Sequence, residues 1–283
     1  MTERVPLPPA GRPQRTRRRR LSWGTALAAG LVAIALLCAL LAPLLLPGAT
    51  DQDVLLGVQA PGDGHLLGTD ELGRDVAQLL VAGSTTAVLG ALAVAVGSMV
   101  VGLLLGVPSG FLAGWVDQIA MRWTDLMFSV PALLVAIVVA GVLGGGFVLA
   151  VIVLIVLFSP GDTRVARAAA MEQAHLPYVE ATRVMGLGTW TVMIRHVVPN
   201  VLPLALANAF LNFGFALVSL ASLSFLGLGV GPGSPDWGRT LAESRTLLFD
   251  NPWAAIAPGL AIIVTAAAVN ILGDRLASRV EAS

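Results

Sequence analysis

The chain has 283 residues, of which 56% are hydrophobic and 12% are charged, and its mean hydropathy is +0.84. A soluble domain of this size does not need so much apolar surface, whereas a polytopic helical membrane protein does. The single cysteine, Cys38, excludes an intrachain disulfide and a cysteine-based metal cluster. Because the net charge is zero, the positions of the charges carry more information than their sum. We therefore expect an all-α fold of membrane-spanning helices.

The N-terminal tail, residues 1–21, is rich in proline and arginine and contains the basic run Arg17 to Arg20. A basic flank before an apolar helix is mostly a topology signal, and the alternative is an arm that binds a membrane surface or a nucleic acid. An uncharged stretch follows and predicts a first transmembrane helix over residues 22–46. Its apolar run is longer than the roughly 7 to 15 residues of a signal-peptide core, which favours a retained helix over a cleaved signal.

An acidic loop over residues 47–84 comes next and is expected to lie outside the membrane, with a short surface helix that has Thr69 as its N-cap. The following core domain, residues 85–273, is expected to hold five more spans, and a short tail covers residues 274–283. The expected spans are residues 85–107, 117–141, 146–169, 199–226 and 252–273. In the first of these, Gly102, Gly106 and Gly110 stand one turn apart, which lets a neighbouring helix approach closely.

A polar segment over residues 174–200 interrupts the core. Pro177 can open a short helix that stops at Gly186, which is expected at the left-handed C′ position. Glu180 and Arg183 are expected to pair on its flank at spacing i,i+3. The residues expected to share one face of this helix are Tyr178, Ala181, Thr182 and Met185.

A second helix of the polar segment is expected to begin with Thr189 as N-cap and to break near Pro199 and Pro203. Arg195 lies on this helix and is a further candidate partner for Glu180. The two helices and the turn between them are predicted to lie against the membrane surface.

The span over residues 199–226 is the least apolar of the set. Its polar residues recur on one face, at Asn208, Asn212, Ser219 and Ser222. Polar atoms are not left bare in lipid, so this face must meet another helix or a water-filled path. Interhelical hydrogen bonding and lining of a translocation pathway are both consistent with the pattern.

The polar segment carries Glu180-Ala181-Thr182, then Gly186, then Val197-Val198-Pro199-Asn200. This pattern resembles the EAA motif of ABC-importer permease subunits, which usually reads Glu-Ala-Ala, then Gly, then Ile-Leu-Pro. Residues 65–76 (HLLGTDELGRDV) and 223–230 (LSFLGLGV) resemble two signatures of the dipeptide, oligopeptide and nickel branch of that family. The resemblance covers nearly all of the chain after residue 65.

The resemblance implies a type I ABC-importer permease fold with six transmembrane helices in a bacterial inner membrane. It also implies that the EAA segment is a cytoplasmic coupling helix that docks into a groove on an ATP-hydrolysing partner. The implied partners are a second permease subunit, two ATPase subunits or one fused ATPase, and an external substrate-binding protein. ATP and Mg²⁺ would be bound by the ATPases, and no cofactor is expected in this chain. The residues implied in coupling are Tyr178, Glu180, Ala181, Thr182, Arg183, Met185, Gly186, Arg195 and Pro199.

The substrates that the resemblance implies are di- or oligopeptides, with nickel chelates or glutathione-like compounds as alternatives. The arginines test the topology independently. With six spans and both termini inside, only Arg74, Arg239 and Arg245 fall outside, and the other 14 of the 17 basic residues are cytoplasmic. This asymmetry obeys the positive-inside rule and places the polar segment in the cytoplasm.

The chain has no GxxxxGK[ST] loop, no metal-ligand spacing and no nucleophile elbow, so we expect no catalytic site, no metal site and no enzymatic activity of its own. A self-sufficient secondary transporter is one alternative, but no charge is expected deep in a span to serve a proton relay. A membrane scaffold, for which the EAA segment would be only a docking helix, is the other alternative. No nucleic-acid partner is expected.

Overall fold

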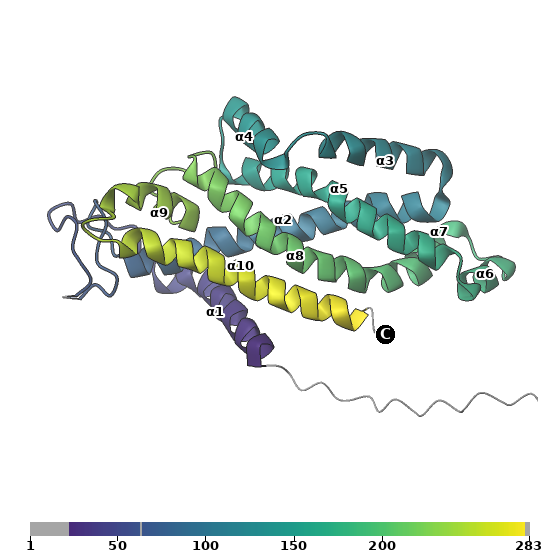
Figure 1. The fold of residues 1–283 in the computed structure, drawn as a ribbon, viewed down its shortest axis with the longest axis horizontal. Helices are drawn as coiled ribbons and strands as arrows, with labels where there is room; N and C mark the ends of the chain where they lie inside the picture. The colour runs from purple at the N-terminus through teal and green to yellow at the C-terminus, as the bar shows by residue number, and fades with distance from the viewer. Residues whose placement is uncertain (1–22, 63, 281–283) are drawn as a thin grey trace, which may run out of the picture.

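The computed structural model describes residues 23–62 and 64–280, and the described residues form helices and no strand (Figure 1). The expected all-α fold is confirmed. The α-helices are α1 (Trp23–Leu45), α2 (Val76–Leu112), α3 (Gly114–Phe128), α4 (Ala132–Leu143), α5 (Phe147–Ala174), α6 (Pro177–Val184), α7 (Thr189–Val192), α8 (Val198–Phe225), α9 (Trp237–Glu243) and α10 (Trp253–Val280), with a π-helical segment η1 (Met193–Val197) and a 3-10 segment η2 (Ser244–Leu247).

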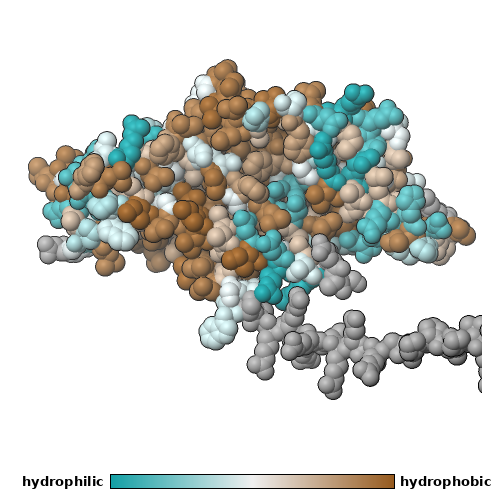
Figure 2. Space-filling view, viewed as in Figure 1, coloured by the Kyte–Doolittle hydropathy of each residue, from teal (hydrophilic) through white to brown (hydrophobic). Residues whose placement is uncertain are grey.

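Five helical runs among the described residues are long and apolar enough to cross a membrane: α1, α2, α5, the run Thr189–Phe225 that ends with α8, and α10. Figure 2 shows hydrophobic residues over much of the visible face and hydrophilic residues in separate groups at the upper left, at the upper right and in the lower middle. Several helices extend beyond the expected spans. In particular, α10 continues to Val280, so the described part of the 274–283 tail is helical.

The third expected span, residues 117–141, is wrong as a continuous helix. α3 and α4 pass the test for a span only as a pair, and they are bent by 82° at the break between them. The break lies at Pro131, which has no N–H to donate and whose ring disfavours helical backbone at Val130. Pro131 therefore ends one helix and stands as the N-cap of the next.

The expected boundary between the first loop and the second span is also wrong. α2 begins at Val76 rather than near residue 85, because the carboxylate of Asp75 caps it by accepting a hydrogen bond from the N–H of Gln78. Thr69 does not cap a surface helix. Its hydroxyl donates to the carbonyl of Gly57 at 2.7 Å, and the described residues of this loop form turns.

α2 and α5 pack closely through the glycines expected to allow it. A Cβ added at Gly102, Gly106 or Gly110 would collide with the backbone or Cβ atoms of α5 between Asp162 and Met171. α8 packs against both helices, and α10 and α1 cover the side of the bundle shown at the bottom of Figure 1. The prediction of a close helix contact at these three glycines is confirmed.

The second helix of the polar segment does not break at Pro199 or Pro203. α7, η1 and α8 form one continuous helical run from Thr189 to Phe225. The wide π-helical turn of η1 directly precedes Pro199 and gives room for a ring that has no N–H. The N-cap of α7 is Gly188 and not Thr189.

Candidate functional site

The short helix α6 lies at one end of the bundle, beyond the last turn of α5 (Figure 1). It opens at Pro177 as expected, and it ends before Gly186, whose φ of +77° is left-handed. The N–H of Leu187 returns to the carbonyl of Thr182 at 3.2 Å, which is the longer hydrogen bond of a Schellman cap. The helix therefore stops where the sequence predicts and for the predicted reason.

The faces of α6 differ from the expectation. Thr182 is buried and Tyr178 is half-buried, whereas Ala181 and Met185 are exposed, so these four residues do not form one face. The inward face is instead formed by Thr182 and Val179, and Val179 is completely buried. Val179 is an apolar residue in the interior of a short helix, and its burial decides the rotation of α6 against the bundle.

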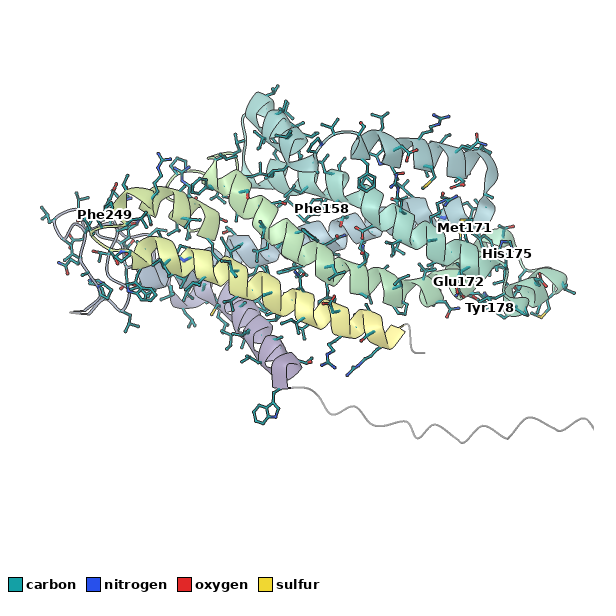
Figure 3. All side chains as sticks on the ribbon, viewed as in Figure 1. Phe158, Met171, Glu172, His175, Tyr178 and Phe249 are labelled. Atoms are coloured by element: carbon teal, nitrogen blue, oxygen red, sulfur yellow. The ribbon has the colours of Figure 1, made fainter. Side chains whose placement is uncertain are left out.

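Hydrogen bonds from Tyr178 join α6 to the helices on both sides. Its hydroxyl donates to the side chain of Gln173 on α5 at 2.6 Å, and the side-chain amide of Asn200 on α8 donates to it at 3.0 Å. The same amide donates to the carbonyl of His196 in η1 at 2.8 Å. Figure 3 shows Tyr178 with Glu172 and His175 at this end, and Phe249 at the other. α6 is thus fixed to α5 and α8.

The outward side of the same segment presents apolar side chains that the described chain leaves uncovered. We call these residues the docking surface: Val184, Met185, Leu187, Trp190 and Ile194, which are between 39% and 89% exposed. A contiguous exposed apolar patch beside polar residues marks a surface for another protein or for a membrane.

The charged candidates of the segment lie beside the docking surface. Glu180 and Arg195 are exposed and form no ion pair with each other. The expected pair of Glu180 with Arg183 involves a side chain outside the described part of the structure. Pro199 is exposed in the first turn of α8.

The polar residues of α8 divide into two groups. The side-chain amides of Asn208 and Asn212 donate to one carboxylate oxygen of Asp162 on α5, at 2.6 Å and 2.9 Å. Ser219 and Ser222 are both half-buried, and the hydroxyl of Ser222 donates to the carbonyl of Val218 in its own helix. The first two residues therefore make the interhelical contact that the pattern allowed.

Asp162 is the functional candidate that the sequence reasoning missed. Asp162 falls in the second half of the expected span 146–169; α5 runs on to Ala174, and Asp162 is only 4% exposed on this helix. Asp162 is therefore a carboxylate buried between helices of the bundle, two residues before Arg164 on the same helix. The signal that could have found it is the pair of asparagines four residues apart on α8, which needs a polar partner on a facing helix.

A second polar cluster lies at the opposite end, between the first loop and α9. The guanidinium of Arg74, 4% exposed, donates to Asp70 at 2.7 Å and to Glu243 at 3.0 Å, and Glu243 also accepts from Arg239 at 2.7 Å. Burial alone would raise the pKa of Glu243, but its hydrogen bonds with Arg239 and Arg74 outweigh burial and hold this pKa below the usual value.

This arrangement, an all-α bundle of spanning helices with a helical segment docked on one polar end, defines the class of polytopic membrane proteins. The comparison with protein families identifies the chain within that class. Residues 102–282 match the model of the binding-protein-dependent transport system inner membrane component. The chain belongs to this family, and it is the permease subunit of an ABC importer, as the sequence resemblance implied.

Similar curated proteins agree with this assignment. The glutathione transport system permease protein GsiD of Pectobacterium atrosepticum is 35% identical over 264 residues, which cover 92% of this chain and 87% of the relative. The di/tripeptide transport system permease protein DppC of Pseudomonas aeruginosa is 37% identical over 246 residues, with 84% and 81% covered. The probable D,D-dipeptide transport system permease protein DdpC of Escherichia coli is 34% identical over 222 residues, with 78% and 74% covered.

A solved structure supports the fold. The chain is similar to the MetNI methionine ABC transporter in an inward-facing conformation, with a TM-score of 0.52 and 20% sequence identity over 71% of this chain and 96% of the other. At this identity the likeness concerns the fold alone. It confirms the expected type I importer permease architecture, and the family makes the chain a multi-pass inner-membrane protein.

Proposed function

We propose that this chain forms half of the translocation path of an importer for di- or oligopeptides and that α6 couples it to a partner ATPase. The observation that carries the proposal is the docking surface, which exposes Val184, Met185, Trp190 and Ile194 on a segment fixed to its own bundle through Tyr178. An apolar surface on a rigidly held short helix is what a helix-in-groove contact requires.

The proposed assembly contains this chain, a second permease subunit, two ATPase subunits or one fused ATPase, and an external binding protein. ATP and Mg²⁺ would be held by the ATPases. When the ATPases close on ATP, they would displace α6, and the hydrogen bonds of Tyr178 would pass that displacement to α5 and α8. The residues of this chain make contacts and transmit motion, and they carry out no chemical step.

Both termini are proposed to be cytoplasmic. Arg74 and Arg239 lie in the cluster between the first loop and α9. Arg164 and Arg167 lie in the half of α5 that leads into α6, and Arg195 lies in η1, after α6. The end with α6 therefore has the basic residues that the positive-inside rule assigns to the cytoplasm.

The peptide substrate is inferred from the relatives, because the glutathione, di/tripeptide and D,D-dipeptide permeases all bear names of peptide transport. A glutathione-like tripeptide is the second candidate, favoured by the 35% identity to GsiD over 92% of this chain.

The test is uptake into proteoliposomes. The chain with its second permease, ATPases and binding protein should accumulate a labelled dipeptide only when ATP is present on the ATPase side. The chain alone should neither hydrolyse ATP nor accumulate substrate. Substrate-coupled uptake by the chain alone would overturn the proposal in favour of a secondary transporter.

A further inference from the structure

Asp162 joins three helices, α2, α5 and α8, at one buried point of the bundle. Its Cβ lies against Gly102 of α2, and a Cβ added at Gly102 would collide with it. One carboxylate oxygen, Oδ1, accepts the side-chain N–H groups of Asn208 and Asn212 of α8. The other oxygen, Oδ2, is buried and has no hydrogen-bond partner in the described structure. α5 and α8 are therefore joined by a buried polar contact.

Packing alone does not account for a carboxylate at this position. An ionisable residue within a transmembrane helix is costly, and where one is kept it usually serves function. Buried polar groups can often be replaced by apolar residues of similar volume with little loss of stability. On α8 itself, the hydroxyl of Ser222 needs no partner on another helix, because it donates to the carbonyl of Val218.

The contact joins the two helices on either side of the coupling segment, by which we mean the residues between α5 and α8 that include α6, α7 and η1. α5 leads into α6, and η1 leads into α8, so the two helices that Asp162 joins are the two that flank the coupling segment. From Asp162 to the end of α5 is about 18 Å, and from the start of α8 to Asn208 is about 15 Å, at 1.5 Å per residue. The contact thus lies at a similar distance from the segment along both helices.

A second contact joins the same helices next to α6, where Tyr178 bonds to Gln173 of α5 and receives a hydrogen bond from Asn200 of α8. Two joints at separate heights prevent α5 and α8 from splaying apart when α6 is displaced. With only one contact, α5 and α8 could rotate about it, and displacement of α6 would change the angle between the two helices instead of moving them together.

We propose that Asp162 is a positioning residue that clamps α5 to α8, so that the coupling segment moves both helices as one unit. This inference rests on the proposed function. The competing account is that Asp162, Asn208 and Asn212 separate during transport and line the pathway. The two accounts differ in whether α5 and α8 must part during the cycle.

The experiment replaces the polar clamp by a covalent one. Asp162→Cys with Asn208→Cys is made in a Cys38→Ala background, and the assembled transporter is reconstituted with its second permease, ATPases and binding protein. Copper phenanthroline forms the disulfide, and dithiothreitol opens it. Substrate uptake and ATP hydrolysis are measured in both states, and the ratio of the two is the readout.

The clamp predicts that the oxidised pair keeps the uptake per ATP of the Cys38→Ala parent. It predicts that the reduced pair loses at least about fivefold in this ratio, the lower end of a typical coupling between sites. Loss of uptake on oxidation would show that the helices must part and would overturn the clamp. An unchanged ratio in the reduced pair would also overturn it, as would failure of the disulfide to form.

Three further variants separate positioning from folding. Asp162→Leu removes the clamp but keeps an apolar fill, so membrane abundance should persist while the ratio falls. The exchange Asp162→Asn with Asn208→Asp restores a carboxylate to amide bond between the helices and should recover the ratio. Ser129→Ala, which removes an exposed hydroxyl bonded only to the carbonyl of Leu126 at the end of α3, is the control and should change nothing. Normal coupling in Asp162→Leu, with ATPases bound and stimulated by the binding protein, would contradict the clamp while leaving the proposed function intact.

Discussion

Arg74 and Glu243 are 169 residues apart in the chain, and they meet at 3.0 Å between the first loop and α9. Arg74 belongs to the segment that resembles one family signature, and Glu243 belongs to the loop that follows another. The two segments therefore contribute to one ion-pair cluster, which holds the first loop against α9.

Replacing Arg74 by leucine should destabilise this end of the molecule. The change leaves the carboxylates of Asp70 and Glu243 without their shared cation, and breaking a buried ion pair typically costs about 3–5 kcal/mol. The measurement is the thermal unfolding temperature in detergent. Arg245→Leu is the control, because Arg245 is exposed and forms no ion pair among the described residues. Equal shifts for the two variants would contradict the assigned role of the cluster.

The same cluster predicts a dependence on pH. Because the pKa of Glu243 is lowered in the folded state, its contribution to stability is fully present above its usual pKa. It is lost as the pH falls through the lowered value. Glu243→Gln should therefore lose less stability than the parent when the pH falls from 7 to about 3, a range that passes below the usual pKa of a glutamate. Unfolding temperatures across this range are compared with those of Glu71→Gln, which should behave as the parent does because Glu71 is exposed.

Labelling of single cysteines should show which end of the bundle faces the cytoplasm. Leu55 is completely exposed in the first loop, and Val184 is 89% exposed at the end of α6. In a Cys38→Ala background, a cysteine at Leu55 should react with an impermeant maleimide added to intact cells. A cysteine at Val184 should react only after the membrane is opened. The reverse result would place α6 outside and remove its coupling role.

The end of α6 should be sensitive to backbone conformation rather than to space. A Cβ added at Gly186 meets no atom within 4 Å, but the φ of +77° is left-handed, so valine there costs about 1–2 kcal/mol. Gly186→Val should redirect the segment and lower uptake, with membrane abundance unchanged. Gly188→Val is the control, because Gly188 has a φ of −63° and equally open surroundings. Normal uptake by Gly186→Val with the ATPases still bound would refute the argument.

The local features that depend on one residue could be predicted from the sequence. Pro177 and Gly186 bound α6 as expected, and Gly102 with its two neighbours packs against α5. These features can be predicted because each follows from the covalent structure of one residue type: the ring of proline, or the missing Cβ of glycine. The apolar composition likewise predicted the all-α membrane fold.

The features that depend on two distant segments could not be predicted. The rotation of α6 is decided by burial of Val179 against the bundle, which the face pattern of an eight-residue helix does not specify. The burial of Asp162 depends on its partners Asn208 and Asn212 on α8, which the sequence of α5 does not reveal. The continuity of the helix through Pro199 depends on the π-helical turn before it, for which the sequence has no reliable signal.

The most direct test of the coupling role is site-specific cross-linking from the docking surface. A photoreactive phenylalanine analogue is placed at Met185, which is 70% exposed, and the chain is co-expressed with its second permease and ATPases. Illumination should join this chain to the ATPase subunit, and the same analogue at Phe249, 99% exposed at the opposite end, should not. Absence of the ATPase cross-link from Met185 in an assembled, transport-active complex would contradict the account.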